Sequence, residues 1–151
     1  MAATPTSLNF AFLRVHDTRL VQLGALAEKY FPEDPGTCLI KLRQYAEVMA
    51  KIVAARTAAD LAPDDTFNDI LRRLKAERTL PQSATDLFYK LKGTGNSAVH
   101  DLAGNHSDAL VALRIARELG VWFHRTFANE PNFKSGPFMP PKPPVDPSAA
   151  L

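Results

Sequence analysis

Hydrophobic residues in this chain recur every three or four positions over five separate stretches. That spacing places apolar side chains on one face of an α-helix, so it predicts helices rather than strands. The predicted helices cover about residues 17–30, 34–57, 66–78, 81–100 and 108–127. Four of them are long and the one near residue 70 is short. We therefore predict an all-α fold, an up-and-down bundle of four main helices plus a short helix.

The helix expected over residues 34–57 has the widest apolar face, which predicts a place at the centre of the bundle. Its apolar positions repeat at intervals of three and four, and further apolar side chains widen the stripe. On its polar side Arg43 and Glu47 stand four residues apart and can pair. The apolar set is Leu39, Ile40, Leu42, Tyr45, Ala46, Val48, Met49, Ile52 and Val53.

Several helix starts carry recognisable caps. Asp17 precedes the first helix, and Asp34 stands before Pro35, a proline suited to the first helical position. Thr66 and Asp69 have the spacing of a capping box, with Asp in place of the usual Glu. These signals predict where the helices begin.

The chain divides into three parts: an N-terminal arm over residues 1–16, a helical bundle domain over residues 17–127 and a proline-rich tail over residues 128–151. Phe10 and Phe12 make the arm apolar, either as a lid on the bundle or as an exposed docking surface. Seven of the 24 tail residues are proline, which excludes helix and paired strand over much of it. We expect an extended, solvated tail that tethers the domain or drapes over a surface.

Composition narrows the functional classes. The net charge of +2 is too small to indicate nucleic-acid binding without a clustered patch. One cysteine, Cys38, excludes an internal disulfide, and no apolar run is long enough to cross a membrane. We therefore expect a cytoplasmic protein with no membrane contact. The spacing of His100, Asp101 and His106 matches no common metal site, and phosphate-loop and dinucleotide fingerprints are lacking, so we expect neither metal nor cofactor.

The segment from Lys90 to Asp101 contains the strongest chemical signal. Asn96 and His100 stand four residues apart, on one helix face, after Gly93 and Gly95. Glycines thin the surface, so another backbone or a phosphate can approach it closely. Either His100 acts as a general acid/base that Asn96 orients, or the two form a structural hydrogen-bond pair.

A run of basic residues on the short helix is a candidate nucleic-acid interface. Short connections place consecutive helices side by side, so two lysines of the next helix can join the same patch. The alternative is a solvated helix face, since no exposed aromatic residues are interleaved for base stacking. The candidate set is Arg72, Arg73, Lys75, Arg78, Lys90 and Lys92.

Three segments in order carry a resemblance: residues 39–47 (LIKLRQYAE), 95–100 (GNSAVH) and 122–127 (WFHRTF). With the 136–141 exit (GPFMPP), they resemble a helical domain of unknown function near the N-terminus of type I restriction enzyme R subunits and related DEAD/DEAH-box helicase proteins. The resemblance covers about residues 8–141. It implies bacterial defence, a larger polypeptide with nuclease and helicase modules, and other subunits of a restriction complex as partners. Under it, Leu151 is expected to be followed by further chain.

The chain also resembles, more distantly, the HEPN superfamily of four-helix bundles, many of which are ribonucleases and homodimers. The motif of that superfamily is an arginine, often followed by asparagine, with a histidine four to six residues beyond the arginine. Asn96 and His100 match the last two elements, while Gly95 occupies the arginine position. Glycine cannot stabilise charge developing on a phosphate.

The resemblances lead to two functional hypotheses. The first is a non-catalytic accessory module that contacts DNA, RNA or another subunit, in which this domain alone is not an enzyme. The alternative is a metal-independent endoribonuclease that uses His100 and Asn96, with an arginine from elsewhere, such as Arg114 or Arg117. In a homodimer of this kind, two His100 side chains would face each other.

Overall fold

The computed structural model describes residues 6–101 and 105–142, although only the backbone is described at 99–101. This part of the chain is all-helical, with a 3₁₀ turn, five α-helices and no strand. The elements are η1 (Ala11–Val15), α1 (Thr18–Tyr30), α2 (Pro35–Arg56), α3 (Phe67–Ala76), α4 (Gln82–Asp101) and α5 (His106–Phe127). The prediction of an all-α fold is confirmed, and α3 is the shortest of the five α-helices.

The predicted caps explain where the helices begin. The side chain of Asp17 accepts a hydrogen bond from the Arg19 amide, and that of Asp34 accepts one from the Thr37 amide. Thr66 and Asp69 form both bonds of a capping box at the start of α3. These bonds satisfy amides that a helix start leaves without an internal partner.

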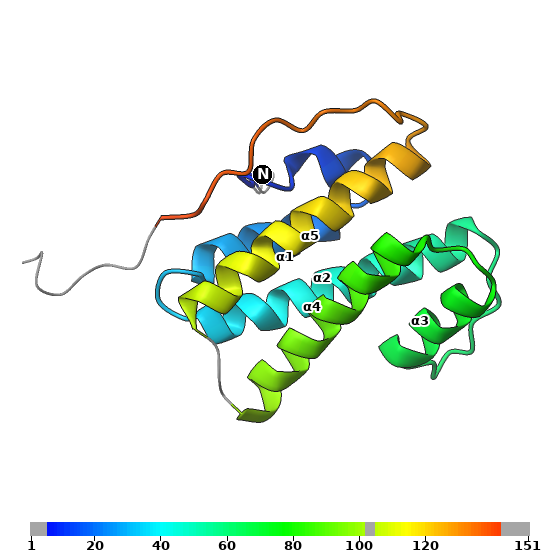
Figure 1. Cartoon of the computed structure of the whole chain (residues 1–151), viewed down its shortest axis with the longest axis horizontal. Helices are drawn as coiled ribbons and strands as arrows, with labels where there is room; N and C mark the ends of the chain where they lie inside the picture. Colours follow the sequence, from blue (N-terminus) through cyan, green and yellow to red (C-terminus); the bar gives the residue numbers. More distant parts are fainter. Residues whose placement is uncertain (1–5, 102–104, 143–151) are drawn as a thin grey trace, which may run out of the picture.

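Helix α2 contacts each of the other four α-helices and lies through the middle of the molecule (Figure 1). The middle of its predicted apolar face is buried, and Ile40, Val48 and Ile52 at its edges are half-buried against the core. Tyr45 is fully buried, with its hydroxyl donating to the Ala116 carbonyl at 2.8 Å. Because α2 packs on all sides, its position decides which faces of α4 and α5 approach one another. The predicted central role of this helix is confirmed.

Three details of the core concern helix ends and the glycines of α4. Tyr30, the last residue of α1, is 37% exposed, whereas the next residue, Phe31, takes the buried place at the helix end. Helix α4 runs through Gly93 and Gly95 to Asp101 as one helix. Of the aromatic residues near the end of α5, Phe123 is buried, whereas Trp122 and Phe127 are half-buried against the core.

The N-terminal arm belongs to the core. Phe10 and Leu13 are fully buried, and the Phe10 ring meets Tyr45 edge-on with ring centroids 5.2 Å apart. Gly24 of α1 makes room for this ring, because a Cβ there would overlap it. Phe12 is half-buried between the rings of His124 and Phe133. The alternative that Phe10 and Phe12 form an exposed docking surface is therefore wrong.

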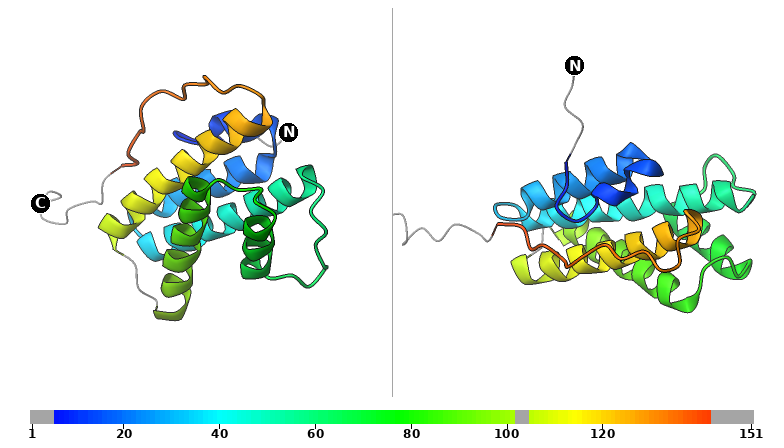
Figure 2. Two further views of the ribbon diagram at one scale, coloured as in Figure 1. Left: turned by 45° about the vertical axis from the view of Figure 1, so that its right-hand side comes forward. Right: turned by 90° about the horizontal axis from the view of Figure 1, so that it is seen from above.

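The described part of the tail, residues 128–142, turns back at the end of α5 and runs along the bundle to the N-terminal arm (Figures 1 and 2). Arg117 donates to the carbonyls of Ser135 and Gly136, at 3.0 and 2.5 Å. Near the N-terminal arm, the side-chain amide of Asn9 binds the backbone of Met139. It donates to the Met139 carbonyl and accepts from the Met139 backbone N–H, both at 2.8 Å. We call residues 130–142 the strap. Draping over a surface is the role that these contacts favour.

Candidate functional site

Asn96 of α4 faces an arginine of α2. The Arg43 Nε donates to the Asn96 Oδ1 at 2.6 Å, which joins the two helices across their interface. Arg43 also donates weakly to Glu47, at 3.4 Å, and its guanidinium lies 5.5 Å from the centre of the Phe67 ring. The Arg43 side chain remains 27% exposed. An arginine of α2 therefore lies beside Asn96 in space, although the residue that precedes Asn96 in the sequence is a glycine, Gly95.

Gly95 sets the close approach of α4 to α2. A Cβ at this position would overlap the Cβ of Arg43, so the two helices meet where α4 has no side chain. The sequence predicted that glycines would thin this helix surface. The group that lies against this thinned surface is the aliphatic part of the Arg43 side chain, because α2 packs against α4 at Gly95.

We expect Gly95→Ala to lower the free energy of unfolding by about 1–3 kcal/mol, since the added methyl group pushes α2 and α4 apart. The matched control is Gly93→Ala in the same helix, where a Cβ meets nothing within 4 Å. Alanine at that site should stabilise the protein by up to about 1 kcal/mol through helix propensity. Urea unfolding followed by circular dichroism measures both, and equal effects would show that α4 does not touch Arg43.

Arg43 is the site residue that sequence reasoning did not single out. Its pairing with Glu47 was predicted, but Asn96 lies 53 residues away and no local pattern connects them. The arginines considered instead are engaged elsewhere: Arg114 lies over the Phe138 ring at 4.5 Å, and Arg117 holds the strap. Neither is the arginine beside Asn96.

The side chain of His100, the other member of the predicted pair, lies outside the described residues. His106 is bound structurally: its Nε2 lies 2.8 Å from the Pro32 carbonyl and its ring meets that of Phe31. The described residues include no group of three or more histidine, cysteine, aspartate or glutamate side chains placed to hold a metal ion. Burial, with smaller effects from Glu28 and Asp34, raises the pKa of the Cys38 thiol to about 12, so Cys38 is no nucleophile.

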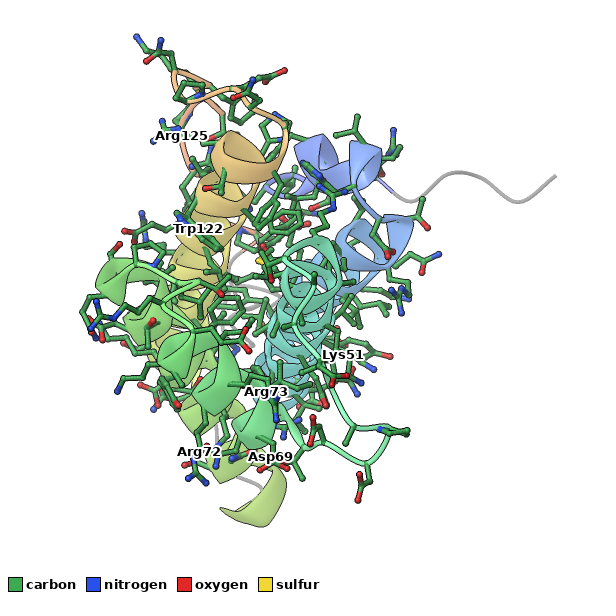
Figure 3. The ribbon with its side chains drawn as sticks, turned by 90° about the vertical axis from the view of Figure 1, so that its right-hand side faces the viewer. Lys51, Asp69, Arg72, Arg73, Trp122 and Arg125 are labelled. Atoms are coloured by element: carbon green, nitrogen blue, oxygen red, sulfur yellow. The ribbon has the colours of Figure 1, made fainter. Side chains whose placement is uncertain are left out.

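The basic residues of α3 are exposed but mixed with acidic ones. Arg72 and Arg73 line a hollow of α3 together with three carboxylates, and Figure 3 shows both arginines beside Asp69. Lys75 and Arg78 are exposed at the end of the same helix region. Lys90 instead lines a groove between α4 and α5, and Lys92 is half-buried. The other two acidic residues of the hollow are Asp65 and Glu77.

A network of hydrogen bonds lies at the C-terminal end of α2, where α2 meets the N-terminal arm and α5. Arg56 donates to the His16 Nδ1 at 3.2 Å, and the His16 Nε2 lies 2.9 Å from the His124 Nδ1. The His124 Nε2 lies 2.9 Å from a carboxylate oxygen of Glu130. Since Arg56 can only donate, His16 must donate to His124, which in turn donates to Glu130. The network joins η1, α2, α5 and the start of the strap.

This arrangement keeps His16 neutral. Burial, the positive charge of Arg56 and the neighbouring His124 together lower its pKa to about 4, against a smaller opposite effect of Glu130. As the pH falls, His16 takes up a proton in the unfolded chain before it does so in the folded protein. The contribution of His16 to the free energy of unfolding is therefore fully present above about pH 6.5 and is lost as the pH drops toward 4.

Between pH 7 and pH 5, we expect the free energy of unfolding to fall by about 1 kcal/mol more in the wild-type protein than in His16→Phe. This figure allows for solvent screening of the half-exposed His16 ring. Urea unfolding of both proteins at the two pH values measures this difference. Parallel losses would mean that other groups carry the pH dependence.

No described helix has the length and hydropathy that a membrane span requires. No protein-family model matches the chain, and no solved structure matches it. The chain is 31% identical over 134 residues to the type I restriction enzyme EcoKI endonuclease subunit of Escherichia coli (strain K12). The match covers 89% of this chain and 11% of that subunit. The chain is thus similar, over most of its length, to a small part of a type I restriction endonuclease subunit.

Proposed function

We propose that this chain is a non-catalytic helical module of a type I restriction R-subunit-like polypeptide, with a HEPN-like bundle and a role in phage defence. One observation carries the proposal: the similarity extends over 89% of the chain yet accounts for only 11% of the restriction subunit. A segment of that proportion is a domain within a larger protein. In this proposal the nuclease and helicase activities belong to other parts of the polypeptide, and the module contacts nucleic acid or other subunits.

The geometry around Asn96 supports a non-catalytic role. The Asn96 oxygen accepts from Arg43, and Arg43 also packs over Phe67. Both side chains therefore have a structural task in joining α2 to α4. Cys38, the one thiol of the chain, is buried and protonated at neutral pH.

The nucleic-acid part of the proposal rests on the exposed arginines of α3. A duplex phosphate backbone brought to the α3 hollow would pair with Arg72 and Arg73, flanked by Lys75 and Arg78. The carboxylates of the hollow would then orient the arginine side chains and weaken binding that lacks this geometry. Lys90 and Lys92 would extend the contact along α4.

The test is DNA binding by gel shift over a range of salt concentrations, with the doubly substituted Arg72→Glu/Arg73→Glu protein. If both arginines contact phosphates, the log–log salt slope should fall by about two. The matched control is Lys29→Glu/Lys134→Glu, which reverses two exposed charges away from α3. Co-purification with the other subunits of a restriction complex tests the second kind of contact. If the α3 substitutions change neither measurement, this helix is only a solvated face.

A second candidate function is a metal-independent endoribonuclease, and the position of Arg43 favours it. An arginine beside Asn96, one helical turn before His100, supplies the charge that the local sequence lacks. Arg43 would stabilise a phosphate during cleavage and His100 would transfer the proton.

Cleavage of RNA in EDTA that falls at least about 100-fold in both His100→Ala and Arg43→Gln would favour the ribonuclease. Arg114→Gln is the matched control, because that arginine lies over Phe138 of the strap. A melting curve for each variant separates lost chemistry from lost folding. No cleavage across a broad panel of RNAs excludes this candidate.

A further inference from the structure

The outward side of α1 carries a groove that the proposed function leaves unassigned. Gly24 and Ala27 belong to the buried stripe of this helix. On its other side, Ala25 and Lys29 line two hollows of about 510 and 490 Å³. Thr6 of the N-terminal arm lines both hollows as well, so they adjoin. We call the two together the α1 groove.

The wall opposite α1 is built from two segments that lie far apart in the sequence. Leu8 belongs to the N-terminal arm, and Lys142 belongs to the strap. Glu28 holds this wall in place, because its carboxylate accepts from the backbone amides of Leu8 and Asn9. Asn9 in turn binds the backbone of Met139, and Figure 1 shows the end of the strap beside the arm. The groove therefore has two walls that one hydrogen-bond network fixes.

Apolar side chains gather in this groove and at its edge. Leu8 is 59% exposed and Met139 is 49% exposed, both high values for large hydrophobic residues. Leu26 of α1 is half-buried, and Pro32 and Pro141 add apolar surface. Singly exposed hydrophobic residues are ordinary, but a contiguous apolar patch with a polar rim indicates an interaction surface.

The accessible charge of the groove is positive. Lys29 and Lys142 are both exposed. Glu28 is the one acidic residue among the described residues that line the groove, and it is only 8% exposed. Its two carboxylate oxygens already accept four hydrogen bonds from the arm. A partner in the groove therefore meets two ammonium groups and no free carboxylate, which favours acidic groups on the partner.

We propose that the α1 groove binds an amphipathic helix of another subunit or domain, with leucine-like side chains on one face and acidic residues beside them. The groove follows α1 from Gln22 to Pro32, which is about 15 Å at a rise of 1.5 Å per residue and matches about three helical turns. The apolar face of the partner covers the exposed apolar side chains, and its carboxylates pair with Lys29 and Lys142. The inference rests on the proposed function, since it names the surface and the partner chemistry of the subunit contact.

A designed peptide is the probe for this site: a fluorescently labelled helix with leucine at every third or fourth position and glutamate beside the leucine face. Fluorescence anisotropy with the purified chain should show saturable binding that weakens as salt is added. Leu8→Gln should weaken binding about tenfold or more. The melting temperature should hardly change, because the Leu8 side chain is exposed and its backbone bond to Glu28 remains. Val15→Gln is the matched control, since Val15 is an exposed residue of the same arm that does not line the groove.

Charge reversal then identifies the groove. Lys29→Glu/Lys142→Glu should weaken binding of the glutamate peptide about tenfold or more. The same variant should prefer a second peptide in which lysine replaces every glutamate, because the attractive and repulsive pairs are exchanged. Lys75→Glu/Lys90→Glu reverses two exposed charges of α3 and α4 and should bind the first peptide as the wild type does.

The absence of saturable binding up to about 1 mM peptide overturns the proposal, as does binding that the groove substitutions leave unchanged. Vesicles of phosphatidylglycerol replace the peptide in a parallel assay. Vesicle binding that the groove substitutions abolish, without peptide binding, assigns the groove to a lipid surface and also overturns the proposal. The peptide assay contains no restriction subunit, so it separates this inference from the proposed function. If co-purification with the other subunits succeeds and the peptide fails, the proposed function stands and the subunit contact lies elsewhere.

Discussion

Replacing Phe10 by alanine is expected to lower the free energy of unfolding by about 4 kcal/mol, the usual cost of emptying a fully buried phenylalanine site. The ring is wholly excluded from solvent. It packs edge-on against the Tyr45 ring and lies directly against the backbone of Gly24. Gly24 has no side chain to move into the space, and Tyr45 is held by its bond to Ala116. The cavity should therefore stay open, so we expect the full cost of about 4 kcal/mol rather than a smaller one.

Thermal and urea unfolding of Phe10→Ala measure this loss directly. Val15→Ala is the matched control in the same arm: Val15 is 76% exposed, so its truncation should change stability by less than about 0.5 kcal/mol. If Phe10→Ala cost as little as the control, the arm would be a detachable lid. The expected result makes it part of the bundle and sets the N-terminal limit of the domain before residue 10.

The local features of this fold could be predicted from sequence because their causes are local. Asp17, Asp34 and Thr66 cap helices through bonds to amides two or three residues away, and the hydrophobic spacing is read within a single helix. These interactions need no knowledge of the partner helix. The five helices and the central place of α2 follow from them.

The contacts that build the candidate site join residues far apart in the chain. The Arg43–Asn96 bond spans 53 positions, the His16–His124 bond 108 and the Asn9–Met139 bonds 130. Spacing rules do not reach across such distances, so Arg43 was recognised only as the partner of Glu47. The same limit applies to the tail: its proline content predicted an extended chain, but not the surface on which it lies.

Replacing Glu28 by alanine is expected to cost about 3 kcal/mol of stability, because it leaves several buried donors without an acceptor. One oxygen of this carboxylate accepts from the Ser7 hydroxyl at 2.5 Å and the Leu8 amide at 3.2 Å. The other accepts from the Asn9 backbone amide at 3.0 Å and from its side-chain amide at 2.7 Å. Glu28 is only 8% exposed, so water replaces these bonds poorly. Glu33→Ala, at an exposed position just after α1, is the control.

The effect of Glu28→Ala should extend to the strap, which makes this variant more informative than a simple loss of stability. Asn9 is held by Glu28 and in turn pairs with both backbone groups of Met139, 130 positions away. Hydrogen exchange should therefore show the Met139 amide losing protection in Glu28→Ala under conditions where the core of α2 keeps its own. A variant that is destabilised but retains protection at Met139 would mean that the strap docks independently of the arm. The expected loss instead makes Glu28 the common anchor of the arm and the strap, the two chain segments that meet beside α1.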